Sequence, residues 1–550
     1  MTRPSSKSGG SSTATKPGSI SARSQYEKRL ALLLVSLALA ASFCFGSAFY
    51  LFKTRWESPA IPPFNHLSDL ATASSSNIQA NDFNGLWSNP MTEQGTHDVE
   101  AKYLAYLPHS GFHNQRIAFE NALVLARILN RTLLVPPVRL GSSVLQYDSF
   151  EKLKHFVEVS EKTKLRHCAN VSSWSTLPVK CRDYFDYTFV PWDWLVNLTS
   201  IMAQQPLITR WNVSDAWLQY NLHITPNDAF SIKDRHEYHY RFVDNNLLDI
   251  AGSRYDESVS ISLLDQVQHR LLHFGTLHGS SRLRLRVGQN IDTRTQIRKA
   301  MIYSNQDLAD TANLIGGLLG GDYLAVHVRI EEKLFSRNSQ DNARLIWWKL
   351  LHKVLGFSSD SVIELEKEIT GSTGVTAPRI KTDLASIRVP HPSLPPLKAG
   401  TPYLPCRGRL HPQEHAVLNT PLYISTDAPH PEAHPSLRLF FKAFPCTFFL
   451  SDFKRYLSNI SHSLEQPSAF ISTRLYANTS ITATHLSPSL SSLVNPYDGL
   501  RLQGFLLPFL DAMVAGRAWS VVGTHGSTFS QFVEDVLWRS WKGWEIVQRG

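Results

Sequence analysis

The stretch from residue 103 to residue 137 constrains the fold of this chain most, because its hydrophobic pattern changes from strand to helix and back to strand. An apolar run, a polar loop, a helix-like segment and a second apolar run follow one another at residues 103–107, 108–114, 115–129 and 132–135. Two prolines then end the second run. This order predicts a βαβ unit, and in open α/β sheets ligands bind where such a loop leaves the first strand.

Three more short apolar runs end in polar residues, which predicts further strands of a doubly wound α/β sheet, at Tyr323–Val328, Leu422–Thr426 and Trp519–Gly523. A chain of 550 residues exceeds one typical domain, so we expect an N-terminal lobe at residues 101–300 and a C-terminal lobe at residues 301–550. Within the second lobe, residues 371–415 are rich in proline, serine and threonine, which indicates a disordered surface insertion.

The first apolar block, residues 30–52, carries no charge and is long enough to cross a bilayer, which takes about 20 residues. A secretory signal peptide is the alternative, but its apolar core usually spans only about 7 to 15 residues. Six basic residues and one acidic residue precede the block, which favours a cytosolic amino terminus. We therefore expect a cytosolic tail at residues 1–29, a transmembrane signal-anchor at 30–52 and a flexible stem at 53–100, in a single-pass type II protein of the Golgi or endoplasmic reticulum membrane.

The tail also contributes a net charge of +5 to the formal net charge of +9, because it holds six basic residues and one acidic residue. The rest of the chain needs no nucleic-acid partner to explain its charge. Four cysteines lie beyond the anchor, an even number that fits two disulfides in an oxidising compartment, and we expect Cys168 to pair with Cys181. Six Asn-x-Ser/Thr sequences fit a secretory glycoprotein.

His327 and Arg329 lie on the same face of the predicted strand that begins at Tyr323. A guanidinium at the carboxyl end of a buried strand can bind a diphosphate with two parallel donors and neutralise the charge of a leaving group. The structural alternative is a salt bridge with Glu331 or Glu332.

The turn at residues 523–531 follows an apolar strand and precedes a helix-like segment, with Thr528 and Gln531 at the spacing of a capping box. Free amides at a helix start bind anions, and Ser527 and Thr528 add hydroxyl donors; an ordinary helix cap is the alternative. Asp427 ends another predicted strand, where a carboxylate can accept hydrogen bonds from guanine. An aspartate in this place is more commonly a turn residue.

Four polar segments, at residues 108–116, 327–329, 425–427 and 523–530, occur in the order seen in GDP-fucose protein O-fucosyltransferases, and the chain resembles that family from about residue 100 to 540. The resemblance implies two Rossmann-like lobes of the GT-B type, with no cofactor and no metal. It also implies inverting transfer of fucose from GDP-fucose to a Ser or Thr hydroxyl of a secretory glycoprotein. The sequence contains no Asp-x-Asp, which agrees with metal independence.

The same resemblance implies roles for individual residues. Arg329 is similar to the arginine that holds the diphosphate, and together with Asn114 it is the expected catalytic residue. The expected nucleotide-sugar site draws on both lobes and consists of Gly111, His113, His327, Arg329, Asp427, Ser527, Thr528 and Phe529.

The chain departs from its relatives at two places. Ser110 stands where relatives that modify thrombospondin repeats carry a glutamate proposed as base, and a serine is a poor general base without a partner. Glu331 lies second after Arg329, where relatives often have aspartate. Two alternatives therefore stay open: a transferase for another nucleotide sugar, and a non-catalytic lumenal binding protein with the same fold. A zinc protease is disfavoured because His236 and His239 lie three residues apart rather than four.

Overall fold

The computed structural model describes residues 100–548, apart from 142–144, 160–161, 163–164, 166, 169–177, 210, 212, 246–252, 304, 332, 380–389, 455–492 and 496–497. The chain divides into two compact units, residues 1–75 and 76–550, and every described residue belongs to the second. The predicted tail, membrane anchor and nearly all of the predicted stem lie outside the described residues. Among the helices that are described, none has both the length and the hydropathy to span a membrane.

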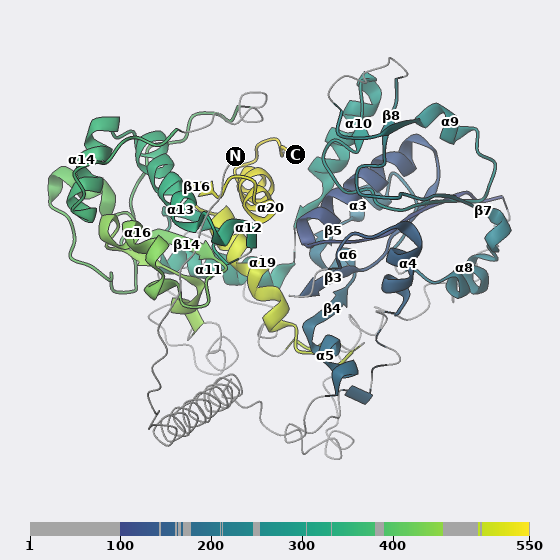
Figure 1. The fold of residues 1–550 in the computed structure, drawn as a ribbon, viewed down its shortest axis with the longest axis horizontal. Helices are drawn as coiled ribbons and strands as arrows, with labels where there is room; N and C mark the ends of the chain where they lie inside the picture. Colours follow the sequence, from purple (N-terminus) through teal and green to yellow (C-terminus); the bar gives the residue numbers. More distant parts are fainter. Residues whose placement is uncertain are drawn as a thin grey trace, which may run out of the picture. The chain divides into compact units, whose positions relative to one another are not determined.

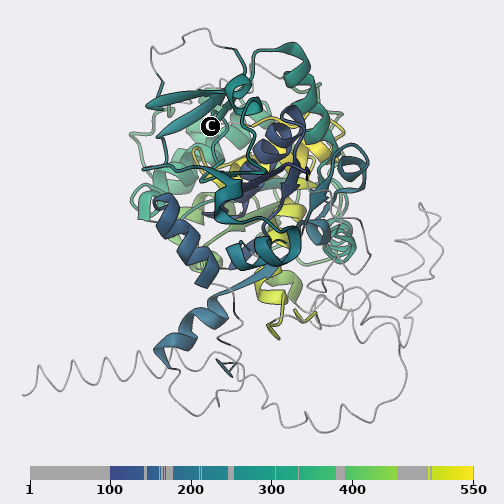
Figure 2. The ribbon, with the colours of Figure 1, turned by 90° about the vertical axis from the view of Figure 1, so that its right-hand side faces the viewer.

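A parallel sheet of five strands carries the N-terminal half of the described chain (Figure 1). Its strands are β1 (Tyr103–Tyr106), β2 (Thr132–Leu134), β6 (Leu207–Ile208), β7 (Ala229–Ile232) and β10 (Leu271–Phe274). They lie in the order β6-β2-β1-β10-β7, and Figure 2 shows the sheet from the side of β7. Helix α3 (Phe112–Ile128) joins the parallel neighbours β1 and β2, which confirms the predicted βαβ unit.

The other elements of this half are short. The helices are α4 (Phe150–Val159), α5 (Val179–Asp186), α6 (Trp192–Leu195), α7 (Thr199–Met202), α8 (Asp215–Leu222), α9 (Ile261–Asp265) and α10 (Gly288–Ala300). Strands β8 (Tyr240–Val243), β9 (Glu257–Ser260) and β11 (Leu283–Arg284) form a small parallel sheet. Two antiparallel pairs join β3 (Val138–Gly141) to β4 (Tyr187–Val190) and β5 (Val196–Asn197) to β12 (Ile302–Tyr303).

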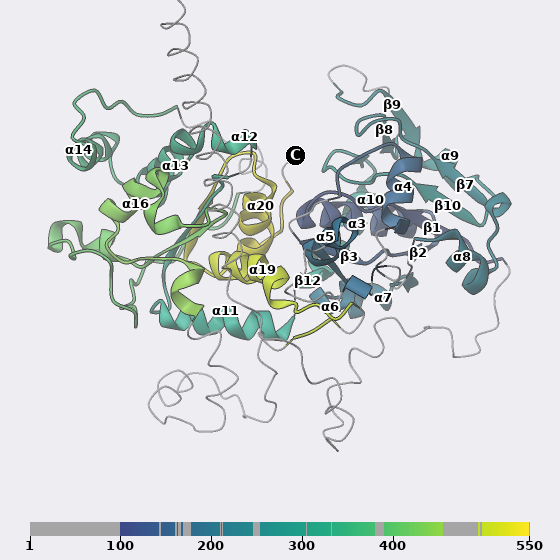
Figure 3. The same cartoon turned by 60° about the horizontal axis from the view of Figure 1, so that its bottom comes forward.

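A second parallel sheet, of four strands, carries the C-terminal half. Its strands are β13 (Leu324–Val328), β14 (Leu422–Thr426), β15 (Thr447–Phe448) and β16 (Ser520–Gly523), in the order β15-β14-β13-β16. Around it lie α11 (Gln306–Leu318), α12 (Lys333–Ser336), α13 (Ser339–Trp348), α14 (Ser359–Thr370), α16 (Arg438–Ala443), α19 (Gln503–Gly516), α20 (Thr528–Gln531) and α21 (Arg539–Trp541). Two π-helical turns, η4 (Lys349–Val354) and η9 (Phe532–Trp538), extend α13 and α20, and α11 packs along α19 (Figure 3).

Each sheet reverses its strand order once. In the first sheet the chain moves outward from β1 in one direction through β2 and β6, and the strands on the other side, β10 and β7, follow later. In the second sheet β14 and β15 lie on one side of β13 and β16 on the other. Ligands of open α/β sheets bind at such points, beyond the carboxyl ends of the strands. The structure therefore offers two positions for chemistry, one between β1 and β10 and one between β13 and β16.

The strands begin and end close to the predicted positions, but α3 begins earlier than predicted. We expected a loop through Asn114 and a helix from Gln115, whereas the helix begins at Phe112. Gly111 is extended (φ −73°, ψ 171°) and its carbonyl accepts from the backbone N–H groups of Asn114 and Gln115. Because Gly111 caps the helix directly, His113 and Asn114 belong to its first turn rather than to a loop.

One hydrophobic core contains side chains from both sheets, including Leu272 of β10 and Tyr423 of β14. A second core covers the other face of the C-terminal sheet, where Val326 and Val328 of β13 pack against Trp347 of α13. The alternation predicted for β13 is therefore observed, since its even-numbered residues share one core while His327 lies on the opposite face.

Part of the predicted disordered insertion is packed against the second lobe. The Pro395 carbonyl accepts from Trp519 Nε1 at 2.9 Å, and Tyr403 N–H donates to the Leu318 carbonyl at 2.9 Å. A disulfide joins Cys406 to Cys446. These hydrogen bonds and the disulfide correct our prediction that residues 390–408 are disordered. The proline and serine content indicated exposure but could not identify the packing partners. The other disulfide is Cys168–Cys181, as predicted.

Candidate functional site

Thr524 ties together the carboxyl ends of β13 and β16. Its backbone N–H donates to the His327 carbonyl at 3.0 Å, and its Oγ1 accepts from the Arg329 N–H at 2.9 Å. The backbone that carries Arg329 is thus fixed where the sheet reverses its order. Sequence reasoning missed Thr524, although a hydroxyl residue directly after a strand that ends in Gly523 was a usable signal.

His327 lies buried at this junction, with 2% of its surface exposed. Burial, with a smaller effect from the Arg329 charge, lowers the pKa of His327 to about 3, so its imidazole is neutral at pH 7. Its Nδ1 lies 2.6 Å from Ser530 Oγ, and its ring centroid lies 4.6 Å from that of Phe529. His327 therefore links β13 to the turn after β16, through Phe529, which we predicted, and Ser530, which we did not.

Arg329 and Asp427, two predicted site residues from different strands, form an ion pair. Arg329 Nε lies 3.1 Å from Asp427 Oδ2, and about a quarter of each side chain is exposed (28% and 25%). The same carboxylate accepts from the backbone N–H groups of Ile330 at 2.7 Å and Glu331 at 3.3 Å. Asp427 thus holds the segment that carries Arg329. Glu331, one of the two salt-bridge partners weighed for Arg329, lies 3.8 Å from His434 instead.

The turn after β16 caps α20 one residue earlier than predicted. Ser527, not Thr528, is the N-cap, and its hydroxyl accepts from the Ser530 N–H at 3.3 Å. Ser527 is buried and Thr528 is exposed. Gly523 is required where the turn leaves the strand, because a Cβ there would lie 2.5 Å from the Ser530 Cβ. Thr528 therefore presents its side chain to solvent at the helix start.

The first turn of α3 contacts η9, the helical segment that follows α20. The Phe112 ring lies 5.2 Å from the Phe532 ring, and the His113 ring lies 5.7 Å from it. Phe112 also packs against Phe509 of α19 at 4.4 Å. The structure therefore brings the first polar motif, with Gly111 and Asn114 beside these rings, next to the last one.

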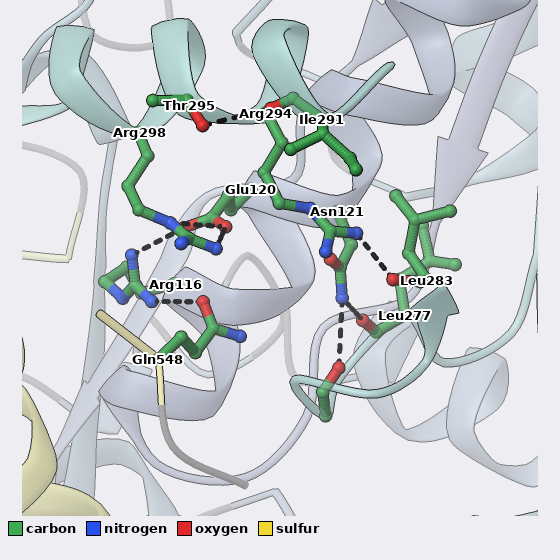
Figure 4. Close-up of polar contacts among 11 residues, drawn as sticks. Arg116, Glu120, Asn121, Leu277, Leu283, Ile291, Arg294, Thr295, Arg298 and Gln548 are labelled. Atoms are coloured by element: carbon green, nitrogen blue, oxygen red, sulfur yellow. Dashed lines mark hydrogen bonds and ion pairs between the residues drawn. The ribbon is translucent and has the colours of Figure 1, made fainter. Parts of the chain in front are cut away.

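Arg116, which the same motif contains, is committed to an ion-pair cluster (Figure 4). It lies 3.0 Å from Glu120 and donates to the Gln548 side chain at 2.9 Å, while Arg298 of α10 reaches Glu120 from the other side. Burial would raise the pKa of Glu120, but the charges of Arg298 and Arg116 outweigh it and lower this pKa to about 2. The cluster joins α3, α10 and the C-terminal segment.

The described part of the chain contains no cluster of three or more side chains that are all available to bind a metal ion. Within it, the one cluster with metal-ligand spacing is His167 with Cys168 and Cys181, and these two sulfurs form a disulfide. His236 and His239 face carboxylates, Asp256 at 2.8 Å and Glu257 at 3.2 Å. Among the described residues, neither histidine belongs to a group of three potential ligand atoms, the number of protein ligands that a catalytic zinc site has.

Residues 103–344 match the family described as GDP-fucose protein O-fucosyltransferase. A curated relative, O-fucosyltransferase 30 of Arabidopsis thaliana, is 62% identical over 37 residues, which is 7% of this chain and 7% of that protein. The aligned stretch is thus a small part of either protein. The family match includes the first polar motif and Arg329, so two of the four motifs that carried the resemblance lie inside it.

Solved structures of POFUT1 are also similar to this chain. One, in complex with GDP-fucose, is 11% identical with a TM-score of 0.32 and covers 79% of this chain and 93% of its own. Another, in complex with GDP, is 12% identical with a TM-score of 0.32 and covers 79% of this chain and 94% of its own. The likeness of this chain to the O-fucosyltransferase family rests on the match over residues 103–344 and on the residues described above.

Proposed function

We propose that this chain, a member of the O-fucosyltransferase-like family, is an enzyme that transfers fucose from GDP-fucose to a Ser or Thr hydroxyl of a secretory glycoprotein. The observation that carries the proposal is the family match over residues 103–344, which includes the loop before α3 and Arg329. The position of Arg329 supports it, because the residue follows the central strand β13, with its backbone N–H bonded to Thr524 after β16 and its guanidinium paired with Asp427 after β14.

The reaction needs stabilisation of the departing diphosphate, and Arg329 is the residue we assign to it. A guanidinium matches phosphate oxygens with parallel N–H donors and keeps its charge at any physiological pH. Ser527 and Thr528 start α20 beside it, where hydroxyl and backbone N–H groups add donors. Transfer would proceed with inversion, as the family resemblance implies. It would need no metal, since these groups supply the positive potential that a metal ion would otherwise provide.

The proposed setting is the lumen of the Golgi or endoplasmic reticulum, with a GT-B arrangement of two lobes behind a single type II membrane anchor. Two disulfides in the described residues support an oxidising compartment. The apolar block at residues 30–52 and the basic tail support the anchor and its orientation.

A nucleotide sugar other than GDP-fucose is a second candidate for the donor substrate, because of the contacts that Asp427 makes. Its carboxylate already accepts two backbone N–H groups and pairs with Arg329, so both oxygens have partners without guanine. A transferase for another nucleotide sugar would need the same phosphate contacts but no guanine contact.

One experiment separates these candidates and a non-catalytic binding protein. The purified full chain is incubated with GDP-fucose in EDTA, and GDP release is measured beside a thermal-shift panel of GDP, GDP-fucose, GDP-mannose and UDP. We expect GDP and GDP-fucose to raise the melting temperature most, and GDP to be released. A larger rise in melting temperature with UDP would indicate a UDP-sugar as the donor substrate. Binding of GDP-fucose without release of GDP would indicate a non-catalytic binding protein.

A further inference from the structure

A second polar cluster lies at the other switch point, where β1 and β10 of the first sheet end. His109 follows β1, and Thr276 and His278 follow β10. His109 is 2% exposed and Thr276 is fully buried. Neither residue belongs to the expected nucleotide-sugar site, and both are polar groups in a place that open α/β sheets use for ligands.

The side chains of this cluster form a continuous chain of hydrogen bonds that starts at Ser110. His109 Nδ1 lies 2.7 Å from Ser110 Oγ, and His109 Nε2 lies 2.5 Å from Thr276 Oγ1. Thr276 Oγ1 lies 3.1 Å from His278 Nδ1 and also accepts from the His278 backbone N–H at 3.2 Å. The serine that replaces the glutamate of some relatives therefore has a histidine partner.

The chain of hydrogen bonds can be satisfied in two opposite senses. In one, Ser110 donates to His109, His109 Nε2–H donates to Thr276, and Thr276 donates to His278. In the other, every donor and acceptor is exchanged, which requires one proton to shift along each bond. Such a chain moves a proton from one end to the other without moving a heavy atom far.

The groups around His109 keep it neutral. Burial, together with His278 and the Arg282 guanidinium, lowers the pKa of His109 well below its usual value, and burial lowers the pKa of His278 to about 4. The Arg282 Nε donates to the His278 carbonyl at 3.2 Å, and Asp234 Oδ2 accepts from the Thr276 N–H at 3.2 Å. The Tyr147 ring meets that of His109 edge-on at 5.4 Å.

Helix α3 connects this cluster to the predicted donor site. Ser110 directly precedes Gly111, the cap of α3. From the same helix, Asn121 donates to the carbonyls of Leu277 at 2.8 Å and Gly279 at 3.2 Å, which holds the loop after β10 (Figure 4). The first turn of α3 packs against Phe532, a few residues after Ser527.

We propose that Ser110, His109 and Thr276 form a proton relay that removes the proton of the acceptor hydroxyl, a role that rests on the proposed fucosyl transfer. The acceptor oxygen bonds to fucose C1 while the bond from C1 to the β-phosphate oxygen breaks, and that electron pair leaves with GDP. The acceptor proton passes to Ser110 Oγ as the Ser110 proton passes to His109 Nδ1. The Nε2 proton of His109 then continues through Thr276 to His278 and to water.

A weak base is sufficient for this step. An uncharged hydroxyl is a poor acid, but its oxygen becomes strongly acidic once it has begun to bond to the electron-poor sugar carbon. The proton therefore moves while the bond to C1 forms, within the same transition state, and a neutral imidazole of low basicity can accept it. This timing also accounts for a site that has Ser110 in place of a carboxylate.

Azide tests the relay directly, because it is a nucleophile that has no proton to lose. GDP release from GDP-fucose by the full chain is measured with water alone and with sodium azide, in the wild type, Ser110→Ala and His109→Asn. We expect both variants to lose about 10²-fold in GDP release with water and to retain the GDP-fucose affinity of the wild type. Azide restores release and gives fucosyl azide, which mass spectrometry identifies.

Two matched pairs separate the relay from a structural role. Thr276→Val removes the hydroxyl at nearly constant shape and should lower kcat at unchanged KM, whereas Thr276→Ser keeps the hydroxyl and should retain activity. His273→Asn, in the buried strand β10 but outside the relay, is the control for His109→Asn and should release GDP with water as the wild type does.

The relay is overturned if Ser110→Ala and His109→Asn release GDP as fast as the wild type, or if azide fails to restore variants that still bind GDP-fucose. A different failure identifies an error in the proposed function itself: the wild type then neither binds nor cleaves GDP-fucose. Melting temperatures of all variants show whether a loss of activity is a loss of fold.

Discussion

The two parallel sheets carry polar clusters of opposite electrical character beyond the carboxyl ends of their strands. After the neighbouring strands β13 and β14 lie a guanidinium and a carboxylate, Arg329 and Asp427, each about a quarter exposed. Between β1 and β10 lie His109 and Thr276, both uncharged and buried. A departing diphosphate needs a fixed positive charge that it can reach, while a departing proton needs neutral groups that can exchange donor and acceptor roles. The difference supports our proposal that the second sheet binds the leaving group and the first removes the acceptor proton.

Arg329→Ala tests the charged side of this comparison and should have the largest effect. Loss of one well-placed donor to a developing anion costs about 10²- to 10³-fold in turnover by analogy with oxyanion sites. The fold should survive, since the side chain is partly exposed. GDP release from GDP-fucose and the melting temperature are the readouts, with Arg329→Lys as the variant that keeps the charge but loses the paired donors. Wild-type turnover in Arg329→Ala would remove the arginine from the reaction.

His273→Phe tests whether the first sheet keeps its histidines uncharged. Burial, more than the nearby charges, lowers the pKa of His273 to about 3, and its ring lies between Phe150 and Trp211. Since this pKa lies below the unfolded value of about 6.5, the unfolded chain binds the proton first, and stability is lost as the pH falls from 6.5 towards 3. At pH 5 the loss from one such histidine is about 2 kcal/mol.

The measurement is the urea midpoint at pH 7.5 and pH 5 for the wild type and His273→Phe. Phenylalanine should fit a ring position between two aromatic neighbours and remove about 2 kcal/mol of the acid-induced loss. Equal losses in both proteins would mean that His273 takes up a proton in the folded state.

Asp427→Asn distinguishes two roles of the carboxylate, positioning Arg329 and recognising guanine. If it holds Arg329, the amide should keep the hydrogen bond from Ile330 but lose the ion pair, and turnover should fall about tenfold with the preference for GDP over UDP unchanged. If it reads guanine, that preference should fall as well. Competition binding with GDP and UDP distinguishes the two results.

Ser530→Ala should have the smallest effect and shows that the second sheet also contains a neutral pair. The change removes the hydroxyl that lies 2.6 Å from His327 Nδ1 and should lower stability by about 1 kcal/mol. Ser540→Ala, on the exposed side of α21, is the matched control. A larger loss of turnover than of stability would place His327 in the reaction itself.

The sequence predicted β1 and β2 of the first sheet, β13, β14 and β16 of the second, and the motifs at their ends, because short apolar runs and polar tips are local signals. It did not predict β6, β7, β10 or β15. Tyr103–Tyr106, Leu324–Val328 and Leu422–Thr426 were found within one residue at each end. It could not predict that Arg329 would pair with Asp427, since the two residues lie on different strands and only the sheet order brings them together.

Contacts between distant residues also explain what was missed. Ser110 looked like a base without a partner, although His109 stands next to it in the sequence. The rest of the relay, Thr276 and His278, lies in the loop after β10. Adjacent residues in a chain commonly point apart, so only the structure shows that Ser110 and His109 face each other. The packing of residues 390–408 was missed for the same reason, because composition carries no information about partners.

The most direct test of the account is a crystal structure of the full chain with GDP. The carboxyl end of the second sheet should hold the diphosphate, with the Arg329 guanidinium within hydrogen-bond distance of the β-phosphate and the start of α20 contacting the same phosphates. The cluster of His109 and Thr276 should remain free of the nucleotide. A GDP bound elsewhere, with Arg329 still paired to Asp427 as it is here at 3.1 Å, would contradict the central claim.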